Sequence, residues 1–137
     1  MMKILILLVL IFSFISPCVA GSVSFSLSGG EYNYVPEPRL RYPIYETATI
    51  SGDQGLEFSW WNNVTNTSGF ILKLYKGYNM YADNLMFKEN LPAGADSFKA
   101  KPDLFVDGEI YTWSLVRISS SGYKSDRSFN SFKVVKK

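Results

Sequence analysis

The sequence of 137 residues contains no histidine and only one cysteine, Cys18. Without histidine, the chain lacks the usual general base, the commonest zinc and copper ligand, and the side chain that titrates near neutral pH. A single cysteine cannot close a disulfide within the chain, so the fold must be stable without one. The chain therefore lacks the side chains that most hydrolases use for catalysis. We expect a protein that is not an enzyme and has no catalytic, metal-binding or cofactor-binding residues.

A strong charge of either sign is also missing, because 14 basic residues face 12 acidic ones. Nucleic-acid binding depends on neutralising many phosphates, so we expect no nucleic-acid partner. Three carboxylates, Asp103, Asp107 and Glu109, lie close together in the sequence. Their spacing lacks the dense oxygen pattern and terminal bidentate acid of known calcium loops. We interpret Asp107 and the glycine after it as an ordinary turn.

The one long apolar run lies at the N-terminus, where Ile4 to Ile15 follow the positive Lys3. A helix breaker and small residues then lead to Ala20, which predicts a signal peptide over residues 1–20 with cleavage after Ala20. The run is shorter than the roughly twenty residues that span a bilayer, so a permanent membrane anchor is the weaker alternative. Lipidation at Cys18 is a second alternative. We expect an exported protein, periplasmic, cell-surface or secreted, that is not an integral membrane protein after cleavage.

Residues 21–37 form a leader before the expected domain. Val23, Phe25 and Leu27 alternate with serines, which predicts an extra edge strand or a segment that becomes ordered only against a partner. Further on, Pro36, Pro38 and Pro43 favour an extended edge segment, because proline cannot donate to a strand on both sides.

The rest of the chain alternates between apolar and polar residues. Leu56, Phe58 and Trp60 fall on one face of a predicted strand, and the residues between them fall on the other. Turn signals at intervals of about ten residues separate this strand from several others. We expect these at 70–75, 85–88, 97–100, 109–119 and 128–135. A helix over 79–90 is the weaker alternative for that segment. The pattern predicts an all-β protein, either an antiparallel sandwich or a barrel.

Three features of the chain resemble the fibronectin type III family. Trp60 is similar to that family's core tryptophan, FVDGEIY and the following TWSL to its tyrosine corner, and GYKS to its last hairpin. The resemblance implies a single antiparallel immunoglobulin-like β-sandwich over residues 38–137, with the corner hydroxyl on Tyr111. Trp60, Tyr111 and Trp113 would then be structural residues. The module normally has seven strands, and the leader lies outside that count.

The candidate binding residues form a cluster of tyrosines after the strand at 70–75. Tyr75, Tyr78 and Tyr81 gather with Met80 in LYKGYNMYADN. Tyrosine offers a broad contact area with a polar tip, which suits protein interfaces and the stacking of sugar rings. The alternative is that two of the three tyrosines cover the edge of the sandwich.

Trp61 is the other candidate, because alternation places it opposite Trp60 and away from the core. An exposed tryptophan can anchor a partner, although the leader or the proline-rich segment could instead cover it. Together these features predict a non-enzymatic exported module for binding or assembly in the cell envelope or extracellular space. Its partner would be another envelope or extracellular protein. The alternative is a carbohydrate-binding module that uses surface Tyr and Trp residues on a polysaccharide.

Overall fold

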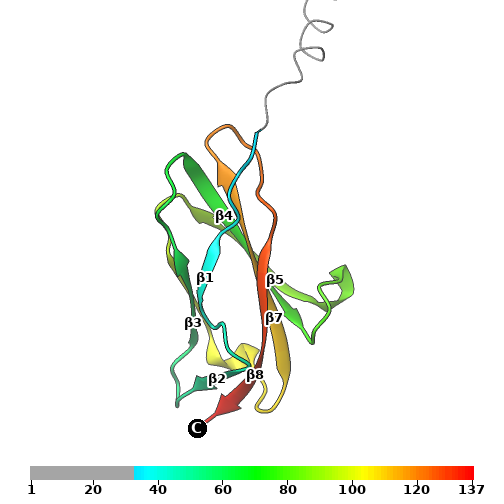
Figure 1. The fold of residues 1–137 in the computed structure, drawn as a ribbon. Helices are drawn as coiled ribbons and strands as arrows, with labels where there is room; N and C mark the ends of the chain where they lie inside the picture. The colour runs from blue at the N-terminus through cyan, green and yellow to red at the C-terminus, as the bar shows by residue number, and fades with distance from the viewer. Residues whose placement is uncertain (1–32) are drawn as a thin grey trace, which may run out of the picture. The chain divides into compact units, whose positions relative to one another are not determined.

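The computed structural model describes residues 33–137, which contain eight strands and two short 3₁₀-helices (Figure 1). The expected signal peptide (1–20) and most of the expected leader (21–32) lie outside the described residues. Residues 33–37 of the leader carry no strand. None of the helices in 33–137 has the length and apolar character needed to cross a membrane. The elements in chain order are β1 (Arg39–Tyr42), β2 (Thr47–Ile50), β3 (Leu56–Trp61), β4 (Thr67–Lys76), η1 (Ala82–Asn84), β5 (Leu85–Pro92), β6 (Ser97–Ala100), η2 (Pro102–Leu104), β7 (Ile110–Ser119) and β8 (Ser128–Lys136).

The strands form two sheets that face each other. The smaller sheet has the order β1-β3-β6, and the larger has the order β2-β8-β7-β4-β5. The predicted all-β sandwich is confirmed, and β1 is an edge strand as the prolines indicated. The expectation of a wholly antiparallel fold is wrong at one place, because β2 pairs with β8 in parallel. This strand of four residues was not expected, since so short an alternation gives little signal.

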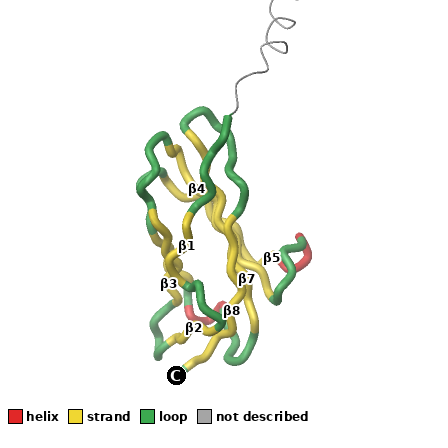
Figure 2. Tube along the Cα trace, viewed as in Figure 1, coloured by secondary structure: helices red, strands yellow, loops and turns green. Residues whose placement is uncertain are grey.

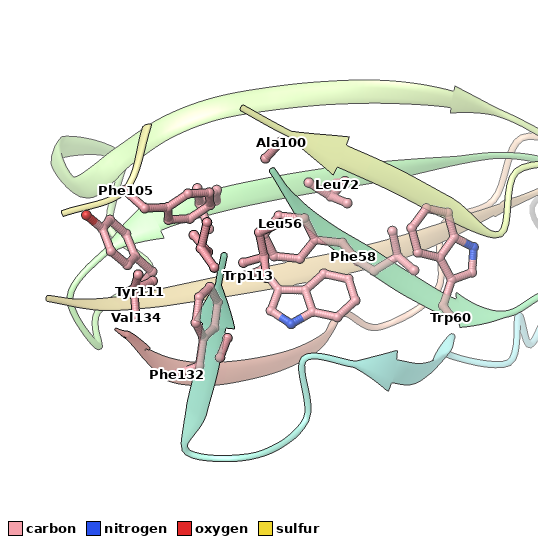
Figure 3. Packing of buried hydrophobic residues seen from close by; sticks show 14 of the residues in the cluster. Leu56, Phe58, Trp60, Leu72, Ala100, Phe105, Tyr111, Trp113, Phe132 and Val134 are labelled. Atoms are coloured by element: carbon pink, nitrogen blue, oxygen red, sulfur yellow. The ribbon is translucent and has the colours of Figure 1, made fainter. Parts of the chain in front are cut away.

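The core lies between the two sheets and is built from one face of each strand (Figure 3). In β3, Leu56, Phe58 and Trp60 are buried, as their alternation predicted. The Phe58 ring lies 4.9 Å from the Trp113 ring of the opposite sheet, measured between centroids. Full burial of one large apolar side chain is worth roughly 1.5–3 kcal/mol, so these residues hold the sheets together.

A tyrosine corner connects β7 to the segment before it. The Tyr111 hydroxyl accepts a hydrogen bond from the Val106 backbone N–H, with the two heavy atoms 2.8 Å apart. Gly108 has a φ of +84°, a conformation that glycine adopts without strain, and it forms the turn between these two residues. The chain thus reverses direction within five residues at the position that the family resemblance implied.

Side chains hold the segment that crosses from the small sheet to the large one. The Pro43 carbonyl accepts hydrogen bonds from Trp113 Nε1 at 2.9 Å and from Asn130 Nδ2 at 3.0 Å. A third bond lies before β1, where the Ser128 hydroxyl of β8 donates to the Pro38 carbonyl. Strand β2 pairs with β8 only from Lys133 onward. The two bonds to Pro43 therefore connect the crossing segment, residues 43–46, to β7 and β8 before that backbone pairing begins.

Candidate functional site

The tyrosine hairpin, defined here as residues 77–84, connects β4 to β5. It contains Tyr78, Met80 and Tyr81, three of the candidate binding residues. Figures 1 and 2 show this connection standing out to the side of the sandwich, with η1 at its tip. The side chains of Tyr78 and Tyr81 are 67% and 68% exposed, whereas Met80 is half-buried. Two of the predicted residues therefore form an exposed aromatic surface.

The base of the tyrosine hairpin is bonded to the neighbouring strand β7. The Gly77 N–H donates to the Ile110 carbonyl at 2.8 Å, and the Gly77 carbonyl accepts from Thr112 Oγ1 at 2.7 Å. Thr112 is fully buried, and its hydroxyl also lies 2.6 Å from the Ser131 hydroxyl of β8. The hairpin thus leaves the sheet from a base held by both backbone and side-chain bonds.

Asn84 holds the tip of the tyrosine hairpin. Its side-chain Nδ2 donates to the Asn79 carbonyl at 3.2 Å, and its backbone N–H donates to the Tyr81 carbonyl at 3.0 Å. Gly77 has a φ of +82°, which allows the chain to turn away from β4 without the steric cost of a Cβ atom. The exposed tyrosines are consequently carried on a bonded turn.

Tyr75 does not belong to the exposed surface. Only 4% of its side chain is exposed, so the expectation that all three tyrosines share an accessible surface is wrong for this one. It points to the outer face of β4, which is an interior strand between β5 and β7. On that face Tyr75 shares a pocket with β7 side chains and with the long cations Lys124 and Arg127. Alternation predicted the direction of Tyr75, but its burial depends on residues distant in the sequence.

A groove of about 340 Å³ lies beside Tyr78. Its lining combines the ring of Tyr78 and residues of β7 and β8 with one acidic and one basic side chain. The lining includes Glu46, Thr47, Tyr78, Ile110, Ser131 and Lys133. Such a groove can accept an apolar side chain while its charged rim fixes the orientation of the incoming group.

Trp61 is 44% exposed and lies on the small sheet. The guanidinium carbon of Arg41 stands 4.8 Å from the centre of its ring, a cation–π contact. The tyrosine hairpin extends from the large sheet, so the structure does not bring Trp61 together with Tyr78 and Tyr81. Its neighbour Trp60 is buried, and Trp60 Nε1 donates to the Ala95 carbonyl at 3.0 Å.

Of the three acidic residues before β7, Asp107 makes a structural contact. Asp107 Oδ1 accepts a hydrogen bond from the Lys136 backbone N–H at 2.7 Å, which fixes the end of β8. Within residues 33–137, no three or more His, Cys, Asp or Glu side chains are grouped so that they could hold a metal ion. The candidate surfaces described above combine exposed aromatic rings with Glu46 and Lys133 beside Tyr78 and with Arg41 beside Trp61.

Comparison with known proteins gives the class of fold. No protein-family model matches the sequence, and no curated protein is significantly similar to it. A solved structure described as a computer-based redesign of a β-sandwich protein is 8% identical with a TM-score of 0.54, covering 74% of this chain and 97% of that one. The fibronectin(III)-like modules of Clostridium thermocellum CbhA are 11% identical with a TM-score of 0.49, covering 72% and 96%.

The described residues form a β-sandwich of two sheets, the fold that the redesigned β-sandwich protein shares, and with its tyrosine corner this is a fibronectin type III-like fold. The resemblance drawn from the sequence is thereby confirmed for the fold. Sequence identities this low establish a shared fold but not a shared function, because one fold supports many unrelated functions.

Proposed function

We propose that the protein is an exported, non-enzymatic module for binding or assembly, and that it contacts another envelope or extracellular protein through the tyrosine hairpin. The exposure of Tyr78 and Tyr81 on a hydrogen-bonded hairpin carries this proposal. The apolar run and small-residue cleavage site within residues 1–20 support export.

The geometry of the tyrosine hairpin suits a protein partner. Tyrosine is enriched at protein interfaces, since its ring buries a large area and its hydroxyl bonds at the rim. A turn that is already bonded in the free protein loses less conformational entropy on binding than a loose one. The groove beside Tyr78 offers a place for one apolar side chain of the partner between Glu46 and Lys133.

Carbohydrate binding through surface rings is the alternative. It requires ring faces that are open to a sugar, and Trp61 is 44% exposed. The guanidinium of Arg41 lies over the Trp61 ring, however, and competes for the face on which a sugar would stack. The protein contact is therefore the better supported function.

The test is cross-linking of the tagged full-length protein in its native cells, followed by mass spectrometry of the captured proteins. Wild type is compared with Tyr78→Ala and with Tyr123→Ala, whose side chain is 48% exposed in the turn between β7 and β8. We expect one defined protein to be captured by wild type and Tyr123→Ala and to be lost, by about tenfold or more, in Tyr78→Ala. Equal capture by all three variants would exclude the hairpin as the contact. Capture of no protein, together with retention of wild type on neutral polysaccharide resins, would favour the alternative.

A further inference from the structure

Arg117 is a cation on the inner face of the sandwich. It follows Tyr111, Trp113 and Leu115 in the inward row of β7, and only 2% of its side chain is exposed. Our interpretation of the sequence did not single it out. The period-two alternation of β7 could have identified Arg117, because it places this arginine on the face of the strand where apolar residues are expected.

The Arg117 guanidinium is incompletely satisfied. Its Nη1 donates to the Pro36 carbonyl at 2.6 Å, and its central carbon lies 5.8 Å from the centre of the Phe70 ring. A guanidinium has five N–H donors, and this bond uses one of them. Its Nε atom is buried without an acceptor, and no carboxylate within residues 33–137 forms an ion pair with it.

An unpaired buried cation is costly for a protein. Charged groups that are buried are normally paired or hydrogen-bonded, because otherwise no interaction within the protein compensates for the solvation energy that they lose. Burial accordingly lowers the pKa of the Arg117 guanidinium below its ordinary value. A bound anion would supply the missing charge and accept the remaining N–H groups of Nη1 and Nη2, since the buried Nε is out of reach of a ligand.

Arg117 lines a pocket of about 260 Å³ at the end of the sandwich where β7 finishes and β4 begins. The pocket combines apolar side chains with hydroxyl and amide groups; Val35 and Val64 supply apolar surface, Thr65 and Ser119 hydroxyls, and Asn66 an amide. The exposed ring of Tyr34 lies at the same pocket. The tyrosine hairpin leaves from the opposite ends of these strands, beside Lys76 and Tyr111.

We propose that this pocket binds the carboxylate of an acidic sugar, a uronate, with Arg117 as its charged group. The planar guanidinium fork matches a carboxylate, and one cation balances its single negative charge, whereas a phosphate dianion would leave charge uncompensated. The rim hydroxyls and the Asn66 amide can bond to sugar hydroxyls, and the valines can contact the ring C–H groups. This site is separate from the tyrosine hairpin, so it extends the proposed function.

The probes are D-glucuronate and D-galacturonate, titrated into the isotope-labelled protein and followed by NMR. D-glucose and acetate serve as matched controls, the first lacking the carboxylate and the second lacking the sugar. We expect saturable shifts at Thr65, Asn66 and Ser119 with at least one uronate, and binding of glucose and acetate weaker by about tenfold or more. Affinity should fall as salt is raised, because the interaction includes an ion pair. Binding of acetate as tight as that of the uronates would overturn the sugar assignment.

Two charge variants complete the test. Asn66→Asp places a negative charge at the pocket, at a φ of +60° that aspartate tolerates. Asn63→Asp makes the same change at an exposed position in the same loop that does not line the pocket. We expect uronate binding to weaken about fivefold in Asn66→Asp and to stay unchanged in Asn63→Asp. Arg117→Lys, which keeps the charge and loses the fork, should also weaken binding. Failure of both uronates to bind wild type, or equal loss in both Asn variants, would overturn the proposal.

Discussion

Tyr111 stabilises the domain through both parts of its side chain. Its ring stands edge-on to Phe105, with centroids 5.1 Å apart, and lies 6.1 Å from the Phe132 ring of β8. Its hydroxyl accepts the Val106 N–H across the corner. The apolar part thus joins the core, while the polar tip satisfies a backbone donor at the rim of the sandwich.

Tyr111→Phe removes only the hydroxyl and is expected to lower the free energy of unfolding by about 1–2 kcal/mol, because the Val106 N–H loses its acceptor. Urea denaturation followed by tryptophan fluorescence measures the change. Tyr123→Phe, at a side chain that is 48% exposed, is the matched control and should have little effect. Equal stability of wild type and Tyr111→Phe would show that the corner bond adds nothing to the stability of the fold.

At the scale of elements, strands β3 and β6 approach each other closely where β3 begins. A Cβ atom added to Gly55 would lie 2.0 Å from the Ala100 carbonyl oxygen. Leu56, the next residue, is paired with Ala100 in the antiparallel ladder. The absence of a side chain at Gly55 is therefore required by the spacing of two backbones.

Gly55→Ala is expected to destabilise the domain by about 2 kcal/mol, since the new methyl group must push β6 away from β3. Gly94→Ala is the matched control, because a Cβ atom there has no neighbour within 4 Å. Thermal unfolding monitored by circular dichroism compares the two variants. If Gly55→Ala unfolded at the same temperature as Gly94→Ala, the close approach of β3 and β6 would be disproved.

The elements show how far the sequence predicts this fold. The position of β3 and the burial of Tyr111, Trp113 and Leu115 in β7 can be predicted from alternation alone, which is a local property of the chain. Strand β2 escaped prediction because four residues carry little periodicity, and its parallel pairing with β8 joins Thr47 to Lys133. Tyr75 and Tyr78 illustrate the same limit for the site, because the burial of the first and the exposure of the second depend on strands distant in the sequence.

At the scale of the whole molecule, the two sheets described over residues 33–137 share one core. Trp60 from the small sheet and Trp113 from the large one are buried in the same cluster. Which sheet each strand joins could not be derived from the sequence, because that choice is made by pairing between distant segments. Alternation therefore does not show that Trp61 and the tyrosine hairpin belong to separate sheets.

The core that the two sheets share predicts that residues 33–137 unfold as one cooperative unit. Tryptophan fluorescence reports mainly on packing around Trp60 and Trp113, whereas far-ultraviolet circular dichroism reports on the strands. We expect urea transitions from the two probes to coincide for the whole chain, as in two-state unfolding of a small domain. Transitions with separate midpoints would mean that one sheet persists without the other.

The crossing between the sheets has a consequence for how the sequence can change over time. The Pro43 atom that accepts from Trp113 and Asn130 is a main-chain carbonyl, which every amino acid possesses. Substitution in the crossing segment leaves this acceptor in place, whereas substitution of a donor removes a bond. Distant homologues of this chain would therefore conserve the donor side chains in β7 and β8, whereas the amino acids of the crossing segment itself would be free to vary.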